Sequence, residues 1–387
     1  MLLSLFITGM MLFDGLRHWE GKRIIKMSEL EWWETAVIYQ IYPRSFQDSN
    51  GDGIGDLPGI TARLDYIAAL GVDAIWISPF FASPQKDFGY DVADYCDVNP
   101  EYGTLADFDQ LIAKTHQLGM KLIIDIVPAH CSDQHAWFET SRQSRENDNA
   151  IKISEIFSAP GRLHATYNFD LLEWEGLDVD GLKAALSKAV DAFNGTGRLS
   201  FAFSNHDVPR SVTRQLAALN LPASRQDALQ LLLLKLEASL IGSCCIYQGE
   251  ELALDDVHDI PIADLQDPWG IEFAPGFIGR DTCRTPMVWR RSQPHGGFSE
   301  ANRTWLPVSQ RHLDRAALDT AEQAGSVYNE FAAFLKWRKD QPAMMQANHM
   351  SPITGGPRQI IFDRISESQT LRCWFDFDEL AAGFEEV

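Results

Sequence analysis

Basic side chains are scarce in this sequence: 33 lysines and arginines stand against 54 aspartates and glutamates, and the formal net charge is -21. A chain with this charge repels polyanions unless it carries a local basic patch. No such patch stands out along the sequence. We therefore expect neither nucleic acid nor a membrane surface as a partner.

Cysteines are few and irregularly spaced, without a C-x-x-C pair. They are Cys96, Cys131, Cys244, Cys245, Cys283 and Cys373. The adjacent Cys244 and Cys245 lie in an apolar run that is typical of a buried strand. Disulfides and a cysteine metal site are the alternatives, but the scattered spacing favours small core residues in a reducing compartment. We therefore predict a cytoplasmic protein.

The apolar start of the chain, MLLSLFITGMMLF, is too short to span a membrane because Asp14 ends it. It has no lysine or arginine before it and no small-residue cleavage site, which argues against the alternative of a signal peptide. Folded-domain patterning begins only after Met27. We therefore expect residues 1–30 to be an extension outside the fold, with residues 1–26 as a candidate translated upstream segment.

What the sequence does contain, from Trp32 onward, is an alternation of short buried strands with amphipathic helices, the pattern of a parallel α/β fold. With 45% hydrophobic and 22% charged residues, the chain can bury a large core. The predicted strands are 37–42, 74–77, 121–127, 163–169, 199–203 and 243–247. The predicted helices are 59–70, the stretch between Thr104 and Gly119, 179–193 and 226–240.

Each predicted strand ends in polar residues, and a (β/α)8 barrel gathers its active site at the C-terminal ends of its strands. We therefore look for functional residues directly after these strands. Apolar runs at 358–362 and 370–377 predict the start of a small β domain, which we place at residues 343–387.

The segment QIYPRSFQDSNGDGIGDL, residues 40–57, carries oxygen-bearing residues at alternate positions. This spacing suits calcium, which takes about six to eight oxygen ligands, and the interleaved glycines permit a tight wrap. An EF-hand is disfavoured because its twelfth position would be Gly59, and an empty turn is the other alternative. The predicted calcium ligands are Asp48, Asn50, Asp52, Asp56 and the carbonyl oxygen of Ile54.

Three further segments follow other predicted strands: SPFFASPQKDFGYDVADY at 78–95, LIIDIVPAHCSDQHAWF at 122–138 and FAFSNHDVPR at 201–210. Downstream lie IYQGEELAL at 246–254 and GRDTCRTPMVW at 279–289. As a set, with residues 40–57, they resemble the alpha-amylase superfamily of glycoside hydrolases, close to its alpha-glucosidase and oligo-1,6-glucosidase branch. Any one of them alone would be weak.

The resemblance implies a (β/α)8 TIM-type barrel at residues 31–342 that acts on alpha-linked gluco-oligosaccharides or glucosides. It implies that Tyr90 and Asp91 line the sugar subsite nearest the chemistry. It also implies that His130 binds a substrate hydroxyl while Asp125 orients its surroundings. The family commonly has asparagine where Ala129 stands, which removes one local polar contact.

By the same resemblance, His206 binds the sugar and Asp207 stabilises its positively charged transition state, as a carboxylate can in a water-poor site. Arg284, with Arg280 and Asp281, would shape the outer sugar subsites. Arg280, Asp281 and Arg284 complete the predicted substrate site.

Two catalytic carboxylates of the family have no counterpart in this sequence. A retaining glycosidase needs a nucleophile and an acid/base about 5 to 5.5 Å apart, and the family's nucleophile motif G-F-R-x-D does not occur here. Glu155 is a candidate acid, but alignment without gaps places it just before strand six, too close for an intervening helix. The resemblance thus implies that strands four and five and the inserted small domain are absent.

Three functions follow as hypotheses. The first is an alpha-glucosidase-type hydrolase by family, with carbohydrate cleavage strongly impaired or lost. The second is a carbohydrate- or partner-binding protein without catalysis, and the third is a fragment without function. We also expect an open sheet with a gap between strands three and six, whose exposed edges favour self-association.

Overall fold

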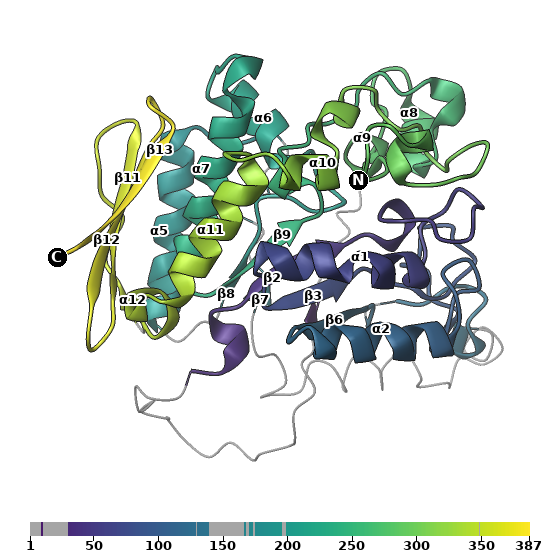
Figure 1. Ribbon diagram of the computed structural model, residues 1–387, viewed down its shortest axis with the longest axis horizontal. Coiled ribbons are helices and arrows are strands. Elements are labelled where there is room, and N and C mark those ends of the chain that lie inside the picture. The colour runs from purple at the N-terminus through teal and green to yellow at the C-terminus, as the bar shows by residue number, and fades with distance from the viewer. Residues whose placement is uncertain are drawn as a thin grey trace.

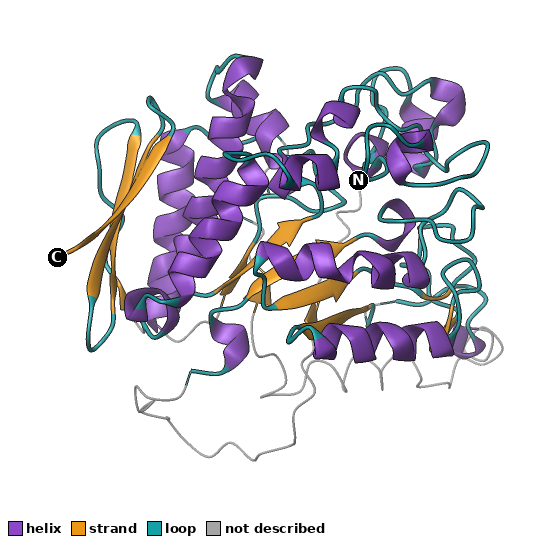
Figure 2. Ribbon diagram, viewed as in Figure 1, coloured by secondary structure: helices purple, strands orange, loops and turns teal. Residues whose placement is uncertain are grey.

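Six parallel strands form the central sheet of the chain (Figures 1 and 2). The computed structural model describes residues 9–10, 30–128, 130–138, 166–167, 170–172, 175–195, 199–347 and 349–387. The parallel strands are β2 (Val37–Ile41), β3 (Ala74–Ile77), β6 (Lys121–Ile126), β7 (Thr166–Tyr167), β8 (Leu199–Phe201) and β9 (Ser243–Tyr247). Each lies within a predicted strand.

The sheet is open. Its order is β1-β6-β3-β2-β9-β8-β7, and β6 and β7 are not paired with each other within the described residues. The short strand β1 (Gly9–Met10) runs antiparallel beside β6, with Gly9 opposite Ile126. The strands that correspond to three and six of a barrel are thus unpaired with each other in this part of the chain. Gly9 and Met10 belong to the stretch expected to lie outside the fold, but they pair with β6 and contact β7, so that expectation is wrong for these two residues.

The two faces of the sheet are packed differently, because successive side chains of a strand point to opposite sides. On β2, Val37, Tyr39 and Ile41 pack into the large core that the helices share, whereas Ile38 joins the inner face. The buried side chains of that inner face are Ala36, Ile38, Ala74, Trp76, Ile123, Leu172, Ala202 and Cys245. Strands buried on both sides read as continuous apolar runs, which is why the sequence revealed them.

Helices α1 (Leu57–Leu70), α2 (Leu105–Gln117), α7 (Gln226–Ser239) and α11 (Val327–Lys339) cover the outer face (Figure 1). The start of α1 is set by Asp56, which accepts a hydrogen bond from the backbone N–H of Gly59, and its end by Gly71 in the left-handed region at φ 94°. A reciprocal capping box between Thr104 and Asp107 starts α2. The predicted helices 59–70 and 104–119 agree with α1 and α2 to within a few residues, although the cap at Asp56 was not predicted.

An antiparallel sheet of four strands, which contains the C-terminus, lies beside α5 (Val179–Gly195) and α7 (Figure 1). It confirms the expected β-rich C-terminal part. Arg364 on this sheet is buried and donates hydrogen bonds to the carbonyls of Ser239, Leu240 and Met344. Since carbonyls at a helix end lack partners within the helix, this contact fastens the sheet to the end of α7. The strands are β10 (His349–Met350), β11 (Gln359–Ile365), β12 (Thr370–Asp376) and β13 (Ala381–Glu386).

Other helices and a hairpin surround these elements. The helices are α5 (Val179–Gly195), α6 (Ser211–Ala218), α8 (Pro268–Phe273), α9 (Asp281–Arg284), α10 (Ala317–Ala321) and α12 (Pro342–Met345), and the hairpin strands are β4 (Phe81–Ala82) and β5 (Asp94–Val98). Of the helices in the described parts of the chain, not one combines the length and apolar character that crossing a bilayer requires.

Candidate functional site

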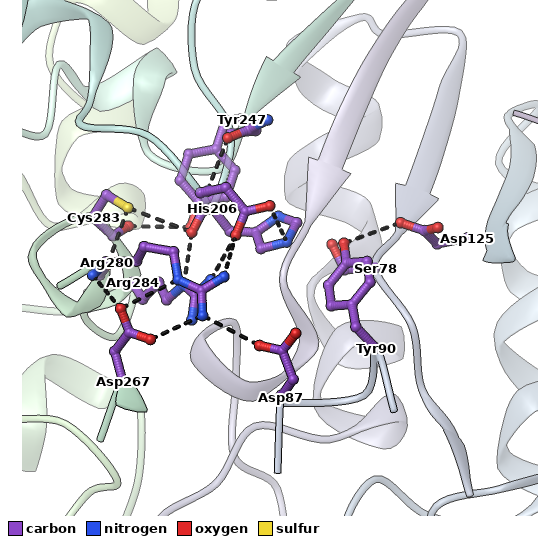
Figure 3. A network of polar contacts seen from close by, with 12 residues as sticks. Ser78, Asp87, Tyr90, Asp125, His206, Tyr247, Asp267, Arg280, Cys283 and Arg284 are labelled. Carbon is purple, nitrogen blue, oxygen red and sulfur yellow. Dashed lines mark hydrogen bonds and ion pairs between the residues drawn. The ribbon is translucent and has the colours of Figure 1, made fainter. Parts of the chain in front are cut away.

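Charged and aromatic side chains meet where the central strands end (Figure 3). They come from β2, the segments that follow β4 and β8, the segment before α8, and α9 with the residue before it. We call six of them the Asp207 cluster: Asp87, His206, Asp207, Asp267, Arg280 and Arg284.

Asp207 sits between two guanidinium groups. Its Oδ1 accepts hydrogen bonds from Nη1 of Arg280 at 3.0 Å and from Nη2 of Arg284 at 2.7 Å. Burial acts to raise the pKa of Asp207, but His206 and the two arginines outweigh it and lower the pKa to about 2. Asp207 therefore carries a negative charge at neutral pH, and 30% of its side chain remains accessible to solvent.

Arg284 is held from several sides. Its Nε donates to the carbonyl of His206 at 2.6 Å, and its guanidinium lies over the ring of Tyr42, 5.5 Å from the centroid. The side chain is buried, and Nη1 has no hydrogen-bond partner within the described residues. A buried N–H group without a partner is costly unless a ligand atom meets it.

His206 is clamped between two tyrosine rings. Its ring centroid lies 5.0 Å from that of Tyr42 and 5.4 Å from that of Tyr90, with interplanar angles of 10° and 17°. Burial lowers the pKa of His206 to about 4, against the opposing pull of Asp207. The imidazole is therefore neutral at pH 7.

Gln40 fixes the tautomer of this neutral ring. Its side-chain amide lies 3.2 Å from Nδ1 of His206 and donates to it, so that Nε2 of His206 carries the proton. Nε2 makes no hydrogen bond within the described residues and lies 3.5 Å from Oδ2 of Asp207. The Nε2–H group of His206 is thus a hydrogen-bond donor that lies beside Oδ2 of Asp207, the carboxylate oxygen that neither arginine binds.

Tyr90 joins the site to β6. Its hydroxyl lies 3.2 Å from Oδ2 of Asp125, which is buried (Figure 3). Burial raises the pKa of Asp125 to about 7, although the hydrogen bond from Tyr90 acts in the opposite direction. Asp125 thus holds the tyrosine that stacks on His206, in line with the orienting role expected for it.

The loop between β4 and β5 contributes Asp87, which the sequence analysis missed, and not Asp91. Oδ1 of Asp87 accepts from Nη2 of Arg280 at 3.2 Å. Asp91 instead accepts hydrogen bonds from Ser83 Oγ at 2.8 Å and from the backbone N–H of Lys86 at 2.9 Å, which closes the loop. Asp87 and Asp91 lie four residues apart and could not be told apart in the sequence. The backbone turn between them decides which carboxylate contacts Arg280.

Arg280 connects Asp87 to the rest of the cluster. Besides its bonds to Asp87 and Asp207, Nη2 donates to Oδ1 of Asp267 at 2.8 Å. The sequence analysis assigned Arg280 to the outer subsites but did not single out Asp267, which carries no motif signal of its own.

His130 takes part in none of the cluster contacts described above. Its side chain is exposed, and its carbonyl accepts a hydrogen bond from the hydroxyl of Tyr95 at 3.0 Å. Glu155, the candidate acid, lies outside the described residues.

The predicted calcium loop is organised by its own backbone. Both carboxylate oxygens of Asp48 are taken: Oδ1 by the N–H groups of Asn50 and Gly51, Oδ2 by Gly53 N–H at 2.8 Å and Ser299 Oγ at 2.5 Å. The side-chain oxygen of Asn50 and one carboxylate oxygen of Asp52 likewise accept a backbone N–H.

Asp56 caps α1 and also accepts from Ser49, so both of its oxygens are engaged as well. Nowhere in the described ranges do three or more acidic, histidine or cysteine side chains gather as a metal site would require. Of the loop's side-chain oxygens, only the second carboxylate oxygen of Asp52 carries no hydrogen bond within the described residues.

Comparison with known proteins gives consistent matches. A family model described as alpha amylase, catalytic domain, matches residues 40–153 and 162–347. A probable alpha-glucosidase of Rhizobium meliloti is 35% identical, with 91% of this chain and 90% of that protein covered. An oligo-1,6-glucosidase of Halalkalibacterium halodurans is 59% identical, with 92% of each chain covered.

The alignment with the Rhizobium protein runs over 505 residues, more than the 387 of this chain, so parts of that relative have no counterpart here. Among solved structures, an alpha-glucosyl transfer enzyme, XgtA, has a TM-score of 0.79 and 31% identity, covering 90% of this chain and 92% of its own. The trehalulose synthase MutB of Pseudomonas mesoacidophila, with a TM-score of 0.79 and 23% identity, shares the fold and covers 90% of this chain and 91% of its own.

Proposed function

The chain belongs to the alpha-amylase family of glycoside hydrolases, and from this premise we propose that it binds alpha-linked glucosides at the Asp207 cluster while hydrolysing them poorly or not at all. The observation that carries the proposal is the pairing of an ionised, part-exposed Asp207 with the neutral, proton-bearing His206 beside it.

Each part of the cluster supports sugar binding. A carboxylate accepts hydrogen bonds from sugar hydroxyls, the N–H of His206 can donate one, and the buried Nη1 of Arg284 still needs an acceptor. The stacked rings of Tyr42, His206 and Tyr90 hold these donors and acceptors in one geometry, so little freedom is lost on binding. Asp207, with its low pKa, is also suited to stabilise a positively charged sugar ring.

Weak hydrolysis follows from the missing carboxylates. Cleavage with retention needs two carboxyl groups about 5 to 5.5 Å apart across the scissile bond, besides any group that stabilises the charge. The G-F-R-x-D motif that would supply the nucleophile does not occur in the sequence. This chain can therefore bind a glucoside without cleaving its glycosidic bond.

Calorimetry with methyl alpha-glucoside tests the proposal. We expect binding by the unaltered chain and at least a tenfold loss for Asp207→Asn, since about 1.4 kcal/mol corresponds to one such factor. Asp133→Asn, a change in an exposed ion pair with Lys86, is the matched control and should leave the affinity unchanged. Equal affinities in all three proteins would contradict the proposal.

Calcium binding by the loop at residues 48–56 is a further proposal. It is supported by the alternating oxygens alone, because the hydrogen bonds described above already satisfy Asp48 and Asp56. An oxygen that accepts one hydrogen bond keeps a lone pair for a cation. Bound calcium would therefore share Asn50, Asp52 and Asp56 with their backbone donors and would tie the loop to the start of α1.

We propose a cytoplasmic location and self-association on separate grounds. All six cysteines lie in the described residues and none forms a disulfide, which suits a reducing compartment. β6 and β7 are not paired with each other within the described residues, and unpaired strand edges can join another copy of the chain.

A further inference from the structure

Trp269 is the most exposed tryptophan in the described parts of the chain, and it lies beside the Asp207 cluster. It keeps 50% of its surface in solvent, whereas Trp76, Trp289 and Trp305 are buried. The guanidinium of Arg280 lies over its ring, 5.0 Å from the centroid. Arg280 also bonds directly to Asp207 and Asp87, so only one side chain separates the indole from the proposed sugar site.

The position of Trp269 is fixed by its surroundings. Asp267, two residues before it, is buried and accepts hydrogen bonds from the backbone N–H and the guanidinium of Arg280. A Cβ atom at Gly270 would lie only 2.5 Å from the carbonyl oxygen of Ile278. The short helix α8 therefore packs closely against the loop segment that leads to Arg280. An exposed tryptophan on so rigid a base costs little entropy when it meets a ligand.

We propose that Trp269 is the stacking platform for the second sugar ring of an alpha-linked oligosaccharide whose first ring occupies the Asp207 cluster. The inference rests on the proposed function. An indole face offers a flat apolar surface of the kind that a pyranose ring covers, and Arg280 beneath it ties the platform to the carboxylates of the first subsite. The chain would therefore prefer disaccharides to simple glucosides.

The experiment compares two probes, methyl alpha-glucoside and maltose, by calorimetry on the full chain. Trp269→Ala should weaken maltose binding roughly three- to tenfold, the range expected for losing an aromatic contact, and should change methyl glucoside affinity less than twofold. Trp269→Phe should retain most of the maltose affinity. Phe273→Ala, on the same helix and 60% exposed, is the control and should affect neither sugar.

Several results would overturn the inference. An unchanged maltose affinity in Trp269→Ala, an equal loss for both sugars, or the same loss in Phe273→Ala would each show that Trp269 is not a specific platform. If the unaltered chain binds neither sugar, the proposed function fails and this inference fails with it. If it binds methyl glucoside but gains nothing from the second ring, only the inference fails.

Discussion

Nε2 of His206 lies 3.5 Å from Oδ2 of Asp207, while Oδ1 of the same carboxylate is taken by two arginines. The two carboxylate oxygens of Asp207 therefore have different roles. One is bound to the guanidinium groups that hold the side chain in place, and the other stands beside a neutral imidazole that does not neutralise it. This division lets one carboxylate be both anchored and available to a ligand.

The first prediction concerns catalysis. The purified chain should hydrolyse a chromogenic alpha-glucoside at least about a thousandfold more slowly than the Rhizobium alpha-glucosidase, because acid–base and covalent catalysis each account for several kcal/mol of the barrier. Steady-state kinetics at matched protein concentration measure it. A normal turnover rate that Asp207→Asn abolishes would contradict the prediction and would make Glu155 the acid to test next.

The second prediction concerns the buried arginine. Asp207→Asn should lower the free energy of unfolding by about 2 kcal/mol, because Arg284 then remains buried without its counter-charge. The figure lies below that for fully buried pairs, since 30% of the Asp207 side chain is exposed. Urea denaturation gives the value. Asp133→Asn, in the exposed pair with Lys86, serves as the control and should cause no measurable change.

The third prediction concerns pH. Burial raises the pKa of Asp125 to about 7, well above the value of about 3.9 for an unfolded chain. Between these two values the folded state binds more protons than the unfolded state, so the contribution of Asp125 to stability is present at low pH and is lost as the pH rises toward 7. Asp125→Asn removes this dependence and keeps an acceptor for the hydroxyl of Tyr90.

Urea denaturation between pH 4.5 and pH 8 tests this reasoning. The free energy of unfolding of Asp125→Asn should rise relative to that of the unaltered chain as the pH increases, by an amount on the order of 2 to 4 kcal/mol over the window. Parallel curves for the two proteins would show that Asp125 titrates normally.

The fourth prediction concerns calcium. Calcium should raise the melting temperature of the unaltered chain, and Asp52→Ala should weaken that effect, because its side chain is exposed and keeps one oxygen without a hydrogen bond among those found. Magnesium at the same concentration is the control, since it prefers a smaller, octahedral site. Identical calcium responses in the two proteins would leave the loop as a turn held by its own hydrogen bonds.

The sequence predicted the strands and helices well because β2, β3 and β9 are buried on both faces and because helix signals such as Thr104 and Gly71 are clear. It also named His206, Asp207, Arg284 and Tyr90, which the structure brings together. It did not separate Asp87 from Asp91, because the backbone turn between them decides which carboxylate faces Arg280. It could not identify Asp267 or Trp269 either, since their roles depend on Arg280, which lies more than ten residues away in the chain.

The last prediction concerns the open sheet. Closing a barrel requires strand number, tilt and stagger to agree, and the sheet described here ends at β7 on one side without pairing to β6. Within the described residues, the strand β1 pairs with β6 only opposite Gly9 and Met10. Unpaired strand edges pair readily with another chain. We therefore expect light scattering to show concentration-dependent association, and a melting temperature below that of the Rhizobium relative. An open edge and an incomplete core would lower both the cooperativity of unfolding and the stability of the chain. A monodisperse monomer that unfolds cooperatively at the same temperature as that relative would therefore mean that the gap between β6 and β7 is closed in solution.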